Sequence, residues 1–106
     1  MLVRPALLLV AVCLATSTLA AEVVAGRQKA AACAACHGQL GLSTTPDAPN
    51  LAGQPALYVA TQLRAYRGGT RNHEVMSLMA KTLSDADIEE LATWFSSLKV
   101  EVQPVP

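Results

Sequence analysis

Two cysteines and a histidine stand close together in the stretch Cys33-Ala34-Ala35-Cys36-His37. Residues three apart are neighbours on a helix, so both thiols would face the same way, and His37 would follow one turn after Cys33. Two thiols can attach to the vinyl groups of a haem, and an imidazole can bind its iron. The spacing therefore predicts a c-type haem attachment site, with one covalently bound haem c as cofactor and His37 as an axial iron ligand.

Three other kinds of site can contain a pair of cysteines at this spacing. A thioredoxin-like redox pair needs a βαβ context, and no strand-rich pattern flanks this one. A zinc site needs further ligands, and the sequence offers only Cys13 and His73 besides the motif. A disulfide between positions three apart would constrain little chain. These alternatives are weaker than haem attachment, but the motif alone leaves them open.

The N-terminus has the composition of a secretory signal peptide. Arg4 precedes an apolar run from Ala6 to Ala15, and small residues follow it. The run is short for a membrane span. Thr18 and Ala20 fit the small-x-small rule for cleavage after residue 20, which would remove Cys13 as well. We therefore expect a signal peptide at 1–20 and a mature, periplasmic chain without a membrane span. A lipid-modified Cys13 is the disfavoured alternative.

The mature chain would be a small, nearly neutral domain. The whole sequence has 8 Lys and Arg against 8 Asp and Glu, and removal of Arg4 leaves seven against eight. This balance gives no indication of a nucleic-acid partner. A domain of this size can build only a marginal core from its own side chains, and a haem would add a large apolar body to it.

The pattern of apolar residues predicts an all-α domain over residues 21–100 and a flexible C-terminal tail at 101–106. A first helix is expected from Glu22 to Cys36, because the segment is rich in Ala, Gln and Lys and lacks proline. Gly38 to Gly53 reads as a loop. Two amphipathic helices follow, starting near Pro55 and Ser84. Their expected buried stripes are Val59, Leu63 and Tyr66 with Leu57 nearby, and Ile88, Leu91, Ala92, Phe95 and Leu98.

The last helix also carries a start signal. Ser84 followed by Asp87 is a capping-box pattern, and Asp85 adds an acidic first turn. Glycines at 68 and 69 end the preceding helix.

A second iron ligand has three candidates in the mature chain. Met76 and Met79 offer thioethers, which raise the reduction potential of a histidine-ligated haem. His73 offers an imidazole but lies in a polar run, where an exposed histidine is the simpler expectation. Residue chemistry alone does not choose between the two methionines.

Residues 22–99 resemble a class I cytochrome c, and in particular a small c553-type protein or one half of a dihaem cytochrome c4. The resemblance rests on the glycine seven residues before the first haem cysteine, on the CxxCH motif and on four further stretches. These are Pro49-Asn50-Leu51-x-Gly53-Gln54, Gln62-Leu63-x-x-Tyr66-Arg67-x-Gly69, Met76 and Leu83-Ser84-Asp85-x-Asp87-Ile88. The resemblance implies a class I cytochrome c fold, with three to four helices wrapped around one haem.

The same resemblance implies roles for individual residues. Met76 would be the second iron ligand, because it lies seven residues before Leu83, with Met79 packed beneath it. The carbonyl of Pro49 would accept the Nδ1–H of His37, and Leu51 would pack on the haem. Gly26 would let the first helix cross the last one closely, against Leu91, Trp94 and Phe95. Tyr66, Arg71 and Asn72 are candidates for contact with the haem propionates, without an assignment among them.

An iron with both axial positions filled has no place for a substrate, which suits one-electron transfer better than catalysis. We therefore expect a non-enzymatic periplasmic electron carrier that works between redox partner proteins, a reductase or dehydrogenase and an oxidase or other acceptor. A dedicated haem subunit of a dehydrogenase uses the same chemistry. A haem-based gas sensor or catalytic haem protein is the alternative if Met76 is labile, and a cofactor-free CxxC module is a third possibility.

Overall fold

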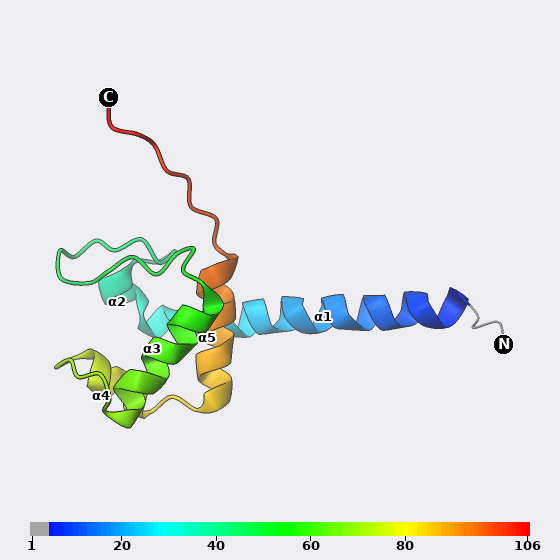
Figure 1. The fold of residues 1–106 in the computed structure, drawn as a ribbon, viewed down its shortest axis with the longest axis horizontal. Helices are drawn as coiled ribbons and strands as arrows, with labels where there is room; N and C mark the ends of the chain where they lie inside the picture. Colours follow the sequence, from blue (N-terminus) through cyan, green and yellow to red (C-terminus); the bar gives the residue numbers. More distant parts are fainter. Residues whose placement is uncertain (1–4) are drawn as a thin grey trace.

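The computed structural model describes the backbone of residues 5–106 and the side chains of residues 17–106. Within these residues the chain forms helices and loops without a strand (Figure 1). The elements are α1 (Pro5–Lys29), the 3-10 turn η1 (Ala30–Ala32), α2 (Ala34–His37), α3 (Ala56–Gly68), α4 (Met76–Lys81) and α5 (Asp85–Ser97). The predicted all-α class is confirmed.

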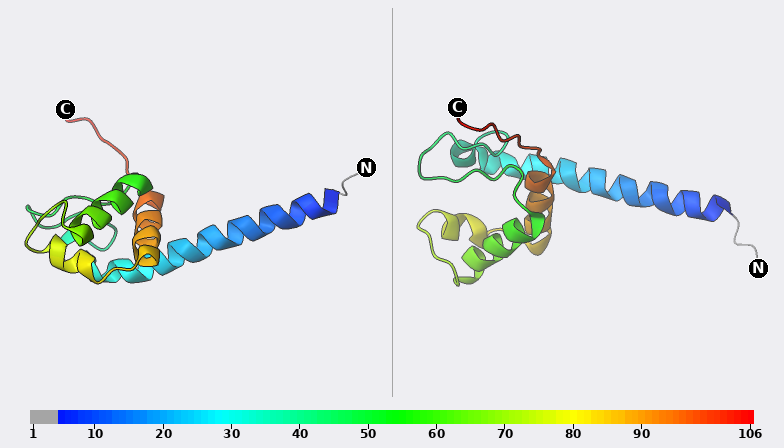
Figure 2. Two further views of the ribbon diagram at one scale, coloured as in Figure 1. Left: turned by 60° about the horizontal axis from the view of Figure 1, so that its bottom comes forward. Right: turned by 45° about the horizontal axis from the view of Figure 1, so that its top comes forward.

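Helix α1 has two parts with different surroundings. Its N-terminal part projects away from the other helices, and its C-terminal part packs beside α5 (Figures 1 and 2). The projecting part holds the predicted signal peptide, of which residues 1–4 and the side chains of 5–16, Cys13 included, lie outside the described residues. The helix continues through the predicted cleavage position after Ala20. Among the described residues, no helix is long and apolar enough to cross a membrane.

The first helix of the domain ends earlier than the sequence predicts. A single helix was expected from Glu22 to Cys36, but α1 ends at Lys29 and a 3-10 turn follows. There the backbone N–H of Cys33 donates to the carbonyl of Ala30 at 2.9 Å, which tightens the chain by one residue. Ala30 is buried among the side chains of α5 at this point. The single turn α2 then leaves the direction of α1 (Figure 1).

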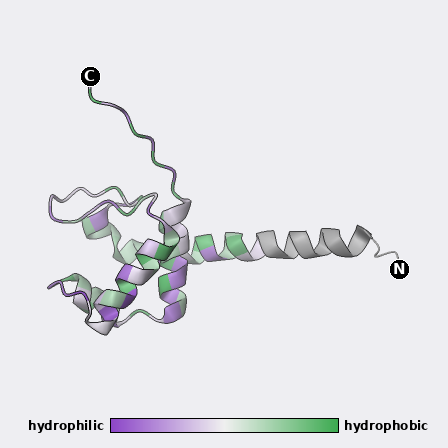
Figure 3. Ribbon diagram, viewed as in Figure 1, coloured by the Kyte–Doolittle hydropathy of each residue, from purple (hydrophilic) through white to green (hydrophobic). Residues whose placement is uncertain are grey.

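Helix α5 supplies most of the apolar core. Ile88, Leu91, Ala92 and Phe95 of the predicted stripe are buried, as is Trp94, and Leu98 is half-buried. Purple and green residues alternate along α5 in Figure 3, as expected for a helix with one face toward the core. The predicted stripe of α5 is confirmed.

Helix α3 buries a narrower face than α5. Val59 and Ala60 pack against Ile88 and Ala92, while Leu63 lies between both halves of the core. Leu57, which the sequence placed near this stripe, is 78% exposed. That expectation is wrong, because Leu57 is the second residue of α3 and lies on its outward face.

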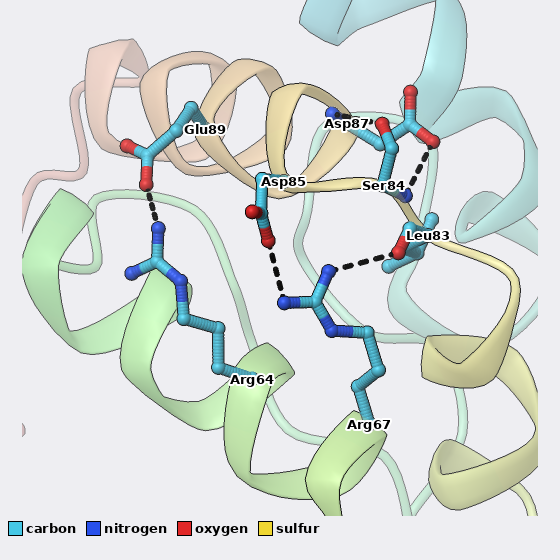
Figure 4. A network of polar contacts seen from close by, with 7 residues as sticks. All are labelled: Arg64, Arg67, Leu83, Ser84, Asp85, Asp87 and Glu89. Atoms are coloured by element: carbon cyan, nitrogen blue, oxygen red, sulfur yellow. Dashed lines mark hydrogen bonds and ion pairs between the residues drawn. The ribbon is translucent and has the colours of Figure 1, made fainter.

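Polar contacts fix the start of α5 and join it to α3 (Figure 4). The predicted capping box is present: the Ser84 hydroxyl accepts the N–H of Asp87 at 3.1 Å, and the Asp87 carboxylate accepts the N–H of Ser84 at 2.9 Å. Arg67 of α3 pairs with Asp85 at 2.5 Å and donates to the carbonyl of Leu83 at 3.0 Å. Helix α4 lies between α3 and α5 in the chain, and the sequence did not predict it.

Candidate functional site

A cavity of about 590 Å³ opens between α2, the loop that follows it, α3, α4 and α5. Its wall is mainly apolar, with Leu51, Leu63, Leu83, Leu91 and Phe95 among the lining residues. All six residues predicted for the haem site also line it. They are Cys33, Cys36, His37, Pro49, Leu51 and Met76. The fold therefore brings two thiols, an imidazole and a thioether together from distant parts of the chain.

The imidazole of His37 lines this cavity and is held in place by its neighbours. His37 is the last residue of α2, and Gly38 ends the helix with a φ of 83°, a conformation that favours glycine. The side chain is only 7% exposed. Its Nδ1–H donates to the carbonyl oxygen of Pro49 at 2.7 Å, so Nε2 keeps its lone pair. The ring is thus prepared to bind a metal through Nε2.

The two thiols differ in their surroundings. Cys33 is half-buried and Cys36 is exposed, and both are free rather than joined in a disulfide. Burial raises the pKa of the Cys33 thiol above its usual value, which disfavours its thiolate before any covalent attachment. The arrangement of two unpaired thiols one helical turn apart fits attachment to a haem better than a structural crosslink.

Both methionines of α4 line the same cavity. Met76 is the first residue of α4 and is half-buried. Met79, which was expected to pack beneath Met76, is 42% exposed. Met79 is thus the more exposed of the two thioethers, and its packing beneath Met76 stays a prediction. The assignment of Met76 as iron ligand stays a prediction.

His73 has a structural role that the sequence did not indicate. Its Nδ1 accepts the backbone N–H groups of Val75 and Met76, each at 3.2 Å, and the backbone N–H of His73 donates to the Ser77 hydroxyl at 2.9 Å. A neutral imidazole that accepts at Nδ1 carries its proton on Nε2. His73 therefore lacks a free lone pair for iron in this arrangement, and it caps α4 beside Met76.

A polar cluster lies on the cavity wall between α3 and the segment before α4. The guanidinium of Arg71 stacks 4.6 Å above the centre of the Tyr66 ring and donates to Gln62 Oε1 at 2.6 Å. His73 meets the same tyrosine edge-on, with ring centres 6.5 Å apart. Of the three propionate candidates, Tyr66 and Arg71 line the cavity and Asn72 does not. Gln62 and His73 also belong to this cluster, and the sequence did not indicate that they lie beside Tyr66 and Arg71.

The donor set fits a haem and agrees poorly with the other interpretations. An apolar cavity with two free thiols, one imidazole and one thioether on its wall offers every protein group that a six-coordinate haem c requires. Among the described side chains, no group of three His, Cys, Asp or Glu residues could hold a metal ion such as zinc. The strand-free surroundings of the motif also lack the βαβ unit of a thioredoxin-like site.

Comparison with known proteins gives one consistent family. A family model described as cytochrome c matches residues 23–99. The chain is 46% identical over 87 residues to the thiosulfate dehydrogenase electron acceptor of Thiomonas intermedia, covering 81% of this chain and 40% of that protein. It is 43% identical over 81 residues to cytochrome c-554(548) of Halomonas halodenitrificans, covering 74% of this chain and 98% of that protein.

A solved structure agrees with these sequence matches. Reduced recombinant cytochrome c4 from Pseudomonas stutzeri aligns with a TM-score of 0.60 and 35% identity, over 63% of this chain and 38% of that chain. The chain thus spans less than half the length of the Thiomonas and cytochrome c4 relatives, and nearly the whole of the Halomonas protein. This chain belongs to the cytochrome c family, with the class I fold and covalently attached haem c as its cofactor.

Proposed function

We propose that this chain is a periplasmic, monohaem c-type cytochrome that carries single electrons between redox partner proteins. One observation carries the proposal: the two thiols, the His37 imidazole and the Met76 thioether line a single apolar cavity. Cys33 and Cys36 would hold the haem covalently, and His37 and Met76 would bind its iron. The haem would supply the one-electron change, and the chain would keep both axial positions filled so that nothing else binds there.

The side chains around the cavity would keep the structural change between the oxidised and the reduced protein small. His37 is buried and hydrogen-bonded to Pro49, so its ring has little freedom to turn. Leu51, Leu91 and Phe95 give the cavity an apolar wall, and a neutral thioether would support the reduced state. Cys36 is exposed, so the cofactor edge attached to it would face a docking partner. Electrons would pass there through a small and short-lived interface.

The printed description of one relative supports a proposal for the partners. A protein that shares 46% of its residues over this domain is described as the electron acceptor of thiosulfate dehydrogenase. We therefore propose a periplasmic dehydrogenase as the electron donor and an oxidase or a further electron carrier as the acceptor. A signal peptide at 1–20 would deliver a mature domain of residues 21–100, with 101–106 as a loose tail.

An optical spectrum of the reduced protein, recorded before and after adding carbon monoxide, tests this function. The protein should be produced in a host that attaches haem c. A haem c spectrum that carbon monoxide does not change is the expected result, because both axial positions are filled. Ready carbon monoxide binding would instead indicate a gas sensor or a catalytic haem protein. Copurification with a dehydrogenase would identify a subunit rather than a diffusible carrier.

A further inference from the structure

The carbonyl that holds His37 belongs to a long irregular loop. Residues 38–55 contain no helix or strand, yet Pro49 O lies 2.7 Å from His37 Nδ1. Backbone contacts secure the base of this loop: the carbonyl of Gly41 accepts the N–H groups of Leu51 and Ala52 at 2.7 and 3.0 Å. They do not reach the part from 42 to 50, where an irregular chain has high conformational entropy. The position of Pro49 O therefore needs another explanation.

Hydrogen bonds from side chains of the loop explain the position of Pro49 O. The hydroxyls of Ser43 and Thr45 each lie 3.1 Å from the carbonyl oxygen of Cys36. The Ser43 hydroxyl, which has one proton to donate, also lies 2.8 Å from the carbonyl oxygen of Thr45 and accepts the Thr45 N–H at 3.1 Å. The backbone N–H of Ser43 donates to Asn50 Oδ1 at 2.7 Å. We call these contacts of Ser43, Thr45 and Asn50 the loop bridge. It connects the residue before His37 with the residue after Pro49.

The loop bridge acts on the two peptide groups that matter for His37. The Cys36 carbonyl belongs to the peptide group that ends at the His37 nitrogen, and the Pro49 carbonyl belongs to the peptide group that ends at the Asn50 nitrogen. Ser43 contacts the first group through its hydroxyl and the side chain of the second group's Asn50 through its N–H. Restraint of both groups fixes the separation between the imidazole and its acceptor.

We propose that Asn50 and Ser43 are positioning residues that hold the Pro49 carbonyl against His37 and so tune the haem. The inference rests on the proposed role of His37 as an iron ligand. A firm Nδ1–H···O bond gives the imidazole more electron density, which favours the oxidised iron. Loss of the loop bridge lets the Pro49 carbonyl swing away, weakens this bond and moves the reduction potential to more positive values.

Hydrogen exchange of the His37 Nδ1–H, followed by NMR in the reduced haem-loaded protein, reports this bond directly. Asn50→Ala removes the Oδ1 acceptor and is expected to speed the exchange roughly five- to tenfold and to raise the reduction potential. Asn50→Asp keeps an oxygen acceptor and should return the exchange rate toward that of the unaltered protein. Ser43→Ala should have a smaller effect of the same sign, because Thr45 still donates to the Cys36 carbonyl.

Ser96→Ala is the matched control, since the Ser96 hydroxyl also donates to a backbone carbonyl but lies on α5, outside the cavity wall. It should leave both exchange and potential unchanged. Asn50 is exposed, so its replacement should not prevent folding. Unchanged exchange and potential in both Asn50→Ala and Ser43→Ala would overturn the proposal. A haem spectrum without histidine ligation in the unaltered protein would contradict the proposed function instead, so the two failures can be told apart.

Discussion

Gly26 of α1 and Trp94 of α5 meet where the two helices cross. A β-carbon at position 26 would lie 2.7 Å from Cβ of Trp94 and would also clash with the backbone carbonyl of Glu90. The predicted close crossing is therefore present, and it depends on the absence of a side chain at this position. Arg27, the next residue, lies with its guanidinium 5.7 Å from the centre of the Trp94 ring and covers the indole from outside.

Gly26→Ala should lower the free energy of unfolding by about 1–3 kcal/mol, because the added methyl group must push α1 away from the α5 backbone. Thermal and guanidinium unfolding of the haem-loaded protein would measure the loss. Gly68→Ala is a matched control. That glycine is also helical, but a β-carbon there would meet nothing within 4 Å. The control should keep or gain up to about 1 kcal/mol, and equal destabilisation of both variants would contradict the crossing as the cause.

The ion pair between Lys29 and Asp87 makes stability depend on pH in the acid range. The two charges lie 2.6 Å apart across α1 and α5. The bond from Lys29, together with the backbone N–H of Ser84, lowers the pKa of Asp87 from 3.8 to about 2. Asp87 therefore binds a proton more weakly in the folded chain than in the unfolded one. Its contribution is complete above about pH 4 and is lost as the pH falls toward 2.

Guanidinium unfolding between pH 2 and 5 tests this dependence. The Asp87→Asn variant should show a flatter fall in the free energy of unfolding than the unaltered protein, and lower stability at pH 5. Glu101→Gln removes a carboxylate from the C-terminal tail, outside the helices, and should keep the original slope. Identical slopes for the unaltered protein and Asp87→Asn would show that the Asp87 carboxylate does not carry the effect.

Replacing Met76 and Met79 one at a time should show which of the two methionines binds the iron. Met76→Ala removes the thioether proposed for the iron, so the reduced protein should gain carbon monoxide binding and its reduction potential should fall. Met79→Ala removes an exposed side chain from the same helix and should leave the spectrum six-coordinate. If Met79→Ala rather than Met76→Ala opens the iron, the two roles are reversed.

Arg71 carries a positive charge on the cavity wall, where it stacks on Tyr66. A cation at this place favours the reduced, less positive haem, so Arg71→Gln should lower the reduction potential. Arg71 is exposed and screened by water, which limits the shift to about 1 kcal/mol, or about 40 mV for one electron. Protein-film voltammetry would measure it.

Arg64→Gln provides the comparison for this charge. Arg64 lies in the neighbouring helix but pairs with Glu89 on the outer face of α3 and α5, and it does not line the cavity. Its replacement should leave the potential within a few millivolts of the original. If Arg64→Gln shifts the reduction potential as much as Arg71→Gln does, the net charge of the protein, rather than the location of Arg71, sets the potential.

Local features of the sequence determined much of this protein. The CxxCH spacing, the Ser84–Asp87 capping box and the periodic apolar stripe of α5 each depend on residues within one or a few helical turns. Such features can be recognised without knowledge of distant contacts. Gly26 was also recognised, but as a member of a family pattern, since a lone glycine in a helix does not say what approaches it.

Only the tertiary structure decided how distant residues combine. His73 caps α4 because the chain folds its ring back onto the N–H groups of Val75 and Met76. Leu57 stays exposed because the other helices cover the opposite face of α3. The loop bridge joins Cys36 to Asn50 across an irregular segment whose course no periodic pattern predicts. The sequence thus indicates the groups that hold a haem, whereas their orientation depends on contacts that form only when the loop and the helices pack together.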